Sequence, residues 1–154
     1  MLKFSGVSAG YNGKDVIKDI TFELEKGKSL AIIGPNSCGK TTLLRAAAGI
    51  IHHRGEIKLS DKSIKSMKRK EIAGKIALMS QINHVHFPYT VYETVMMGRY
   101  RFLRQNLFGK PGQEDMRVVE ETMESTNLME LKNKHLNTLS GGQLQRVYLA
   151  HTLV

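Results

Sequence analysis

The sequence has little of what disulfide-stabilised, exported or membrane-spanning proteins need. Cys38 is the only cysteine among 154 residues, so the chain cannot form an internal disulfide, in keeping with a reducing compartment. Its longest apolar runs, such as residues 30–33 and 46–51, fall well short of the roughly 20 residues that cross a bilayer. The first residues hold one early lysine and no apolar stretch typical of a signal peptide. We therefore expect a cytoplasmic protein with no membrane-spanning segment.

Positive charge exceeds negative charge. The chain has 23 Lys and Arg residues against 14 Asp and Glu residues, a formal net charge of +9. Such an excess is compatible with nucleic acid, an anionic membrane surface or an anionic ligand. Much of it lies in a segment with no interleaved aromatic side chains on which bases could stack. We interpret this segment as a solvated face, made of Lys58, Lys62, Lys65, Lys68, Arg69, Lys70 and Lys75.

The first part of the chain shows strand periodicity and then a helical pattern. Apolar residues from Leu2 to Leu24, around a turn at residues 10–13, predict a small antiparallel sheet. Residues 29–33 form a short apolar run typical of a fully buried strand. After residue 40, good helix formers continue to Gly49, a residue type that commonly ends helices. A glycine-rich segment therefore lies between a predicted strand and a predicted helix.

The rest of the chain becomes mainly helical. Met116, Val119 and Met123 recur three or four residues apart, which gives one apolar face. Ser140 stands at an N-cap with Gln143 in the capping-box position, so a helix is expected from there to the last residue. The other predicted elements are strands over 55–60 and 75–79 and helices over 67–73, 90–103 and 113–128.

The segment Gly34-Pro35-Asn36-Ser37-Cys38-Gly39-Lys40-Thr41-Thr42 matches the pattern of a phosphate-binding loop. Backbone N–H groups can converge on phosphates only where side chains do not intervene, which the two glycines allow. The helix that follows adds the positive end of its dipole. Lys40 can bridge the outer phosphates, the Thr41 hydroxyl can bind Mg²⁺, and Thr42 offers a second hydroxyl.

About a hundred residues after this loop comes Leu139-Ser140-Gly141-Gly142-Gln143. The two motifs, in this order and at this separation, make the chain resemble the ATP-binding cassette family, the motor subunits of ABC transporters. The resemblance implies an α/β fold of the P-loop NTPase type, with an N-terminal antiparallel β subdomain and an inserted helical subdomain, incomplete at its C-terminus. The implied regions are a nucleotide-binding core over 1–82, a helical subdomain over 83–138, and the signature motif with the start of its helix over 139–154.

The same resemblance implies the site residues for ATP and Mg²⁺. Tyr11 matches the aromatic residue that stacks on adenine, and Val16 either lines the same base or packs in the core. Gln81 matches the Q-loop glutamine, which reaches Mg²⁺ and the attacking water. Ser37 stands where the family often has glycine, so a positive φ there would cost on the order of 1 kcal/mol. The nucleotide contacts are then Tyr11, Gly34, Pro35, Asn36, Ser37, Cys38, Gly39, Lys40, Thr41 and Thr42, with Lys40 and Gln81 as catalytic residues and Thr41 and Gln81 at the metal.

In this family the signature motif completes the nucleotide site of a partner subunit. By resemblance, Ser140, Gly141, Gly142 and Gln143 would contact the partner's ATP in a head-to-tail dimer. Hydrolysis also requires an Asp-Glu pair at the end of a later strand, and a histidine after it. Neither lies in residues 1–154, so we expect this chain alone to hydrolyse ATP poorly or not at all.

Three functions stay open on these grounds. The first is the ATPase subunit of a membrane importer, peripheral on the inner face of the membrane and bound to integral permease subunits; no nucleic acid is expected. Residues 90–100 look most like those of importers for iron-siderophore, haem or cobalamin complexes. The second is a soluble ABC ATPase acting on ribosomes or DNA, and the third is a regulatory module that never hydrolyses ATP.

Two smaller sets of residues have competing interpretations. Phe87, Pro88 and Tyr89 would contact the membrane subunit or pack in the helical subdomain. The pairs His52-His53 and His84-His86 have no nearby carboxylate or cysteine cluster, so we interpret them as solvated loop residues and not as metal ligands.

Overall fold

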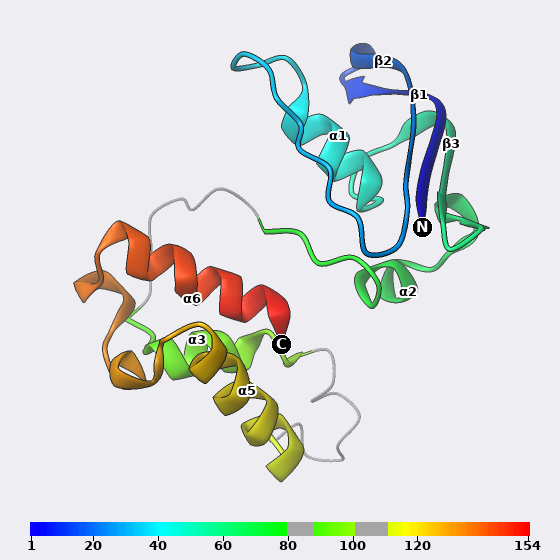
Figure 1. Ribbon diagram of the computed structural model, residues 1–154. Coiled ribbons are helices and arrows are strands. Elements are labelled where there is room, and N and C mark those ends of the chain that lie inside the picture. Colours follow the sequence, from blue (N-terminus) through cyan, green and yellow to red (C-terminus); the bar gives the residue numbers. More distant parts are fainter. Residues whose placement is uncertain (80–87, 101–110) are drawn as a thin grey trace. The chain divides into compact units, whose positions relative to one another are not determined.

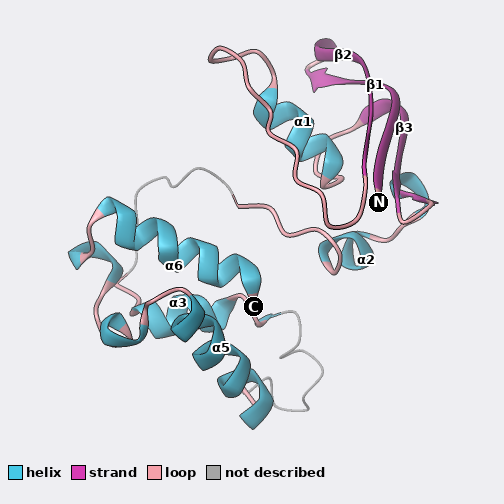
Figure 2. Cartoon of the chain, in the orientation of Figure 1, coloured by secondary structure: helices cyan, strands magenta, loops and turns pink. Residues whose placement is uncertain are grey.

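The computed structural model describes residues 1–79, 88–100 and 111–154, which form two compact units, Met1–Leu78 and Met79–Val154 (Figure 1). The first unit contains a sheet and short helices, and the second is helical (Figure 2). No helix in the described ranges is long and apolar enough to cross a membrane. Gln81, Phe87, His84 and His86 lie outside the described residues.

The sheet of the first unit is antiparallel, as the alternating pattern predicted. Its strands are β1 (Leu2–Tyr11), β2 (Lys14–Leu24), β3 (His53–Leu59) and β4 (Lys62–Ser63), in the spatial order β2-β1-β3-β4. The β1–β2 hairpin turns at Asn12-Gly13, where φ is 52° and 76°; the two-residue type I′ turn needs positive φ at both positions. A register shift in β1 between Phe4 and Val7 lets both of these buried side chains join the core.

Helix α1 (Lys40–Ala47) packs on this sheet through Leu43 and Ala46, which are buried in one cluster with Phe4, Val7 and Ile57. Its C-terminus has a Schellman motif. The N–H of Gly49 donates to the carbonyl of Ala46, and the N–H of Ile50 donates to that of Arg45. Gly49 has the positive φ, 65°, that this motif requires. The glycine predicted to end the helix therefore does so.

The solvated face predicted around residues 58–75 is confirmed, since all seven of its basic side chains are exposed. A 3₁₀ turn at Ile64–Ser66 and helix α2 (Arg69–Ala73) occupy this stretch, close to the helix predicted over 67–73. Two of the cations have partners. Lys62 pairs with Glu71 at 2.8 Å, and the Lys65 ammonium donates to the carbonyl of Gly55 at 2.7 Å.

The strands predicted over 29–33 and 75–79 do not form, so that prediction is wrong. Leu30 is 49% exposed and Ile33 is 92% exposed. A strand requires a neighbouring strand to receive its backbone hydrogen bonds. Within residues 1–79, 88–100 and 111–154, neither segment pairs with a strand. An apolar run indicates a tendency to be buried, but it does not specify a neighbouring strand with which the segment can pair.

The second unit contains helices α3 (Val91–Met97), α5 (Gln113–Ser125) and α6 (Gly141–Leu153), with 3₁₀ turns at Met129–Leu131 and Leu136–Thr138. Helices α3 and α6 lie side by side (Figure 1). Val119 and Met123 of α5 are fully buried, as their spacing predicted, while Met116 is exposed. The core consists of Val91, Val95, Val119, Met123, Leu128, Leu131, Leu136, Val147 and Ala150.

Candidate nucleotide site

The phosphate loop follows an irregular path that two residues with positive φ make possible. Ser37 has φ of 66° and Gly39 has φ of 103° at the N-cap of α1. The expectation of strain at Ser37 is confirmed, since serine in this region costs on the order of 1 kcal/mol more than glycine. Residues 34–38 are all exposed, so a ligand can reach the loop.

Lys40 folds back over the loop that precedes it. Its ammonium donates to the carbonyl of Gly34 at 2.8 Å and to that of Pro35 at 2.6 Å, and it lies 3.8 Å from Cys38 Sγ. A positive charge is thus held inside the loop at the start of α1, where the helix dipole also favours an anion. The arrangement suits a phosphate group.

Gly39 packs the loop directly onto β2. A Cβ atom at this position would lie 2.6 Å from Cγ2 of Ile17 and 3.3 Å from Cγ1 of Val16. Val16 is 43% exposed, so of its two predicted roles core packing does not apply. Thr41 is exposed, whereas Thr42 is buried. A metal ion could therefore reach the Thr41 hydroxyl from solvent.

Tyr11 lies at the end of β1 and is 41% exposed. Its phenol oxygen accepts a hydrogen bond from Arg45 Nη1 in α1 at 3.2 Å. This bond lowers the pKa of Tyr11, and a side-chain hydrogen bond with Thr42 adds to the effect. Arg45 was not predicted as a site residue, because no local pattern indicates a contact between residues so far apart in the sequence.

In the second unit, the signature residues begin α6 with a capping box, as predicted. Ser140 Oγ accepts a hydrogen bond from the N–H of Gln143 at 3.3 Å, and Gln143 Oε1 accepts one from the N–H of Ser140 at 2.9 Å. Gly141 and Gly142 are exposed, and a Cβ atom on either would meet nothing within 4 Å. No close neighbour in the described part of the chain therefore requires glycine at these two positions.

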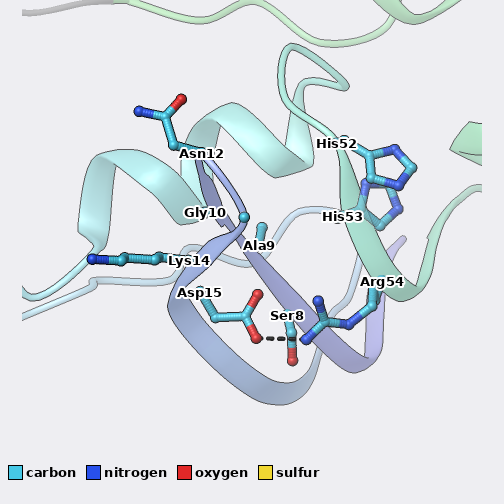
Figure 3. Close-up of a pocket in the computed structure, with 10 residues that line it drawn as sticks. Ser8, Ala9, Gly10, Asn12, Lys14, Asp15, His52, His53 and Arg54 are labelled. Atoms are coloured by element: carbon cyan, nitrogen blue, oxygen red, sulfur yellow. Dashed lines mark hydrogen bonds and ion pairs between the residues drawn. The ribbon is translucent and has the colours of Figure 1, made fainter.

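A shallow hollow of about 250 Å³ lies beside the β1–β2 hairpin (Figure 3). Arg54 and Asp15 form an ion pair at one side of it, and His52 and His53 lie at the other. The interpretation of His53 as a solvated loop residue is wrong. It begins β3, is 6% exposed, and its Nε2 has no hydrogen-bond partner among the described residues. Burial, then the nearby Lys65 charge, lowers the pKa of His53. His52 is exposed.

Comparison with known proteins identifies the family. The family described as "ABC transporter" matches residues 17–154. The chain belongs to the ABC transporter ATP-binding family. A nucleotide-free ATP-binding cassette from an ABC transporter superposes with a TM-score of 0.85 at 22% identity, covering 99% of this chain and 64% of that one. The predicted fold class, the ABC type of P-loop NTPase, is confirmed.

Two curated relatives are ATP-binding proteins of import or transport systems. The chain is 37% identical over 145 residues to the iron(3+)-hydroxamate import ATP-binding protein FhuC of Bacillus subtilis, covering 94% of this chain and 53% of FhuC. It is 34% identical over 155 residues to the manganese transport system ATP-binding protein MntB of Halalkalibacterium halodurans, covering 99% of this chain and 59% of MntB. The chain thus spans a little over half the length of these two relatives.

Proposed function

We propose that this chain binds ATP with Mg²⁺ as part of the ATP-binding subunit of an ABC importer. The observation that carries this proposal is the phosphate loop, in which the Lys40 ammonium is held within 2.8 Å of two loop carbonyls at the start of a helix. The loop would hold the phosphates, Thr41 the Mg²⁺ ion, and Tyr11 with Val16 the base. Lys40 and Gln81 would act in the chemical step.

The signature residues Ser140, Gly141, Gly142 and Gln143 would act on the nucleotide of a second subunit. Glycine destabilises a helix, yet two adjacent glycines begin α6 on open surface. A close approach by something outside the described chain accounts for them. The N-terminus of α6 favours an anion, and the Ser140 hydroxyl can still donate a hydrogen bond while its oxygen accepts from Gln143. A head-to-tail dimer with two ATP molecules fits these features.

The proposed partners beyond this dimer are integral membrane permease subunits, which would hold the protein at the inner face of the membrane. The proposed cargo is an iron-siderophore, haem or cobalamin complex. Its support is the similarity of residues 90–100 to such importers and the 37% identity to FhuC. The chain is also similar to a manganese transport protein, so manganese is the competing cargo. Manganese uptake is therefore the control measurement for the proposed cargo.

Three experiments test the proposal. Sedimentation of the purified chain should show a dimer that requires MgATP, and ATP should bind to the chain in equilibrium dialysis. A chain that neither binds ATP nor associates would contradict the nucleotide function. Disruption of the gene in its source organism should lower uptake of ferric hydroxamate, haem or cobalamin and leave manganese uptake unchanged. The reverse pattern would contradict the proposed cargo.

A further inference from the structure

The hydrogen bond between Tyr11 and Arg45 joins the hairpin to the helix of the phosphate loop. Arg45 Nη1 donates to the phenol oxygen of Tyr11 at 3.2 Å, across 34 residues of sequence. Tyr11 is 41% exposed even with this bond, so a ligand can still reach the residue. The tyrosine is thus fixed at its far end and still accessible.

The backbone of Tyr11 is fixed independently of this bond. Tyr11 pairs with Lys14 across the two-residue turn at Asn12-Gly13, whose positive φ angles define a type I′ hairpin. The remaining freedom of the side chain is rotation about its two χ angles. A hydrogen bond at the phenol oxygen restricts rotation about χ1, because that rotation moves the oxygen, whereas the oxygen lies on the χ2 axis and stays in place when the ring turns about it.

The helix that holds Arg45 is itself packed against the hairpin. Gly39, at the N-cap of α1, leaves no room for a Cβ atom against Ile17 and Val16 of β2. Leu43 and Ala46 of the same helix are buried in the core that includes Ile17 of β2. The phosphate loop, the Val16 side chain and the Tyr11 ring therefore belong to one packed body within the first unit.

We propose that Arg45 is a positioning residue that holds the Tyr11 ring in the place where it receives the base of the nucleotide. This inference rests on the proposed binding of ATP and adds Arg45, which would act on the nucleotide through Tyr11. A ring restricted before binding loses less conformational entropy when a base stacks on it. Arg45 would thus strengthen the binding of nucleotides that carry a base and would leave the binding of phosphate alone unchanged.

The experiment compares two probes, ATP and inorganic tripolyphosphate, which has no base. Isothermal titration measures both affinities for the unaltered chain, for Arg45→Ala, for Tyr11→Phe, and for the double variant. Tyr11→Phe keeps the ring and removes only the hydroxyl. Each single variant should bind ATP about 3- to 10-fold more weakly, as expected for the loss of one exposed hydrogen bond. The double variant should be no weaker than either, and tripolyphosphate affinity should not change.

Arg69→Ala is the control for charge, since Arg69 is an exposed arginine of α2 that lies outside the phosphate loop. The inference would be overturned if Arg45→Ala weakened the binding of ATP and of tripolyphosphate equally, because Arg45 would then act only as a charge. Tyr11→Phe binding ATP as tightly as the unaltered chain would also overturn it. Failure of the unaltered chain to bind either probe would instead overturn the proposed nucleotide function, and this inference with it.

Discussion

The ammonium nitrogen of Lys40 lies 2.6 Å from the carbonyl oxygen of Pro35, so the lysine closes the phosphate loop from inside. If the loop binds ATP as we propose, a phosphate would share this ammonium with the carbonyls of Pro35 and Gly34. Lys40 holds the ends of the loop together, and we propose that it also offers charge to the ligand.

Replacing Lys40 by alanine should remove most nucleotide binding. The loss of a charge-assisted hydrogen bond is worth about 1.5 to 3 kcal/mol, so Lys40→Ala should weaken ATP affinity about 10- to 150-fold. Isothermal titration with MgATP measures the change. Lys18→Ala, which removes an exposed lysine of β2, is the matched control and should bind normally. Equal affinities in the two variants would contradict the role given to the loop.

Gly39→Ala should destabilise the first unit. The new Cβ atom would lie 2.6 Å from the buried Ile17 side chain, and the backbone would keep a φ of 103° that alanine rarely adopts. We expect a loss of about 2 to 4 kcal/mol in the free energy of unfolding. Urea denaturation followed by circular dichroism measures it. Gly13→Ala isolates the φ contribution, because Gly13 also has positive φ but a Cβ atom there would meet nothing within 4 Å.

Much of the local structure could be predicted from short-range signals. The Asn12-Gly13 turn and the reciprocal capping of Ser140 and Gln143 each depend on a few neighbouring residues, and the structure has both. The buried strands predicted over 29–33 and 75–79 failed for the opposite reason. Their formation depends on hydrogen-bonding partners that an apolar run does not specify.

The same division holds at the candidate site. The phosphate loop was predictable because its pattern is contiguous, and so was the strain at Ser37. The bond between Tyr11 and Arg45 was not, since it depends on how the hairpin packs against α1. The burial of His53 was missed for a related reason, because its place at the start of β3 depends on pairing with β1.

Gly141→Asp should separate the contribution of α6 to stability from its proposed contact with the nucleotide of a partner subunit. An aspartate at the first position of α6 would interact favourably with the helix dipole, by about 0.3 to 1 kcal/mol. The free energy of unfolding should therefore stay the same or rise slightly. The same charge would repel the phosphate of a partner's ATP. We expect normal ATP affinity for each chain and loss of the MgATP-dependent dimer in sedimentation. Asn133→Asp adds the same charge at an exposed position and should leave the dimer intact.

The purified chain should bind MgATP without hydrolysing it at an appreciable rate. Residues 1–154 contain no Asp-Glu pair, the combination that the family uses to hold Mg²⁺ and to polarise the attacking water. Phosphate release should therefore be no faster than in the Lys40→Ala variant. Steady release that Lys40→Ala abolishes would show that another group in this chain activates water.

Asp115 should make the stability of the helical unit depend on acid pH. Its carboxylate accepts hydrogen bonds from the N–H of Gly112 and from the Arg99 side chain, both at 2.9 Å. The Gly112 bond, and then the Arg99 bond, lowers the pKa of Asp115 below its ordinary 3.8. A lowered folded-state pKa stabilises the fold fully above the unfolded-state pKa, and this stabilisation is lost as pH falls through the folded-state pKa.

Asp115→Asn tests this dependence, because asparagine resembles the protonated acid and carries no charge. At pH 7 the free energy of unfolding of the variant should be about 1.5 to 3 kcal/mol lower than that of the unaltered chain. Denaturation followed by circular dichroism measures it. The difference should begin to shrink as pH falls below about 4, since Asp115 of the unfolded chain then binds a proton, and it should be lost only as pH falls through the lowered folded-state pKa. Glu124→Gln, at an exposed position on the same helix, should lose little stability at any pH. A difference that persists undiminished in acid would mean that the shape of the carboxyl group, and not its charge, stabilises the Arg99 contact.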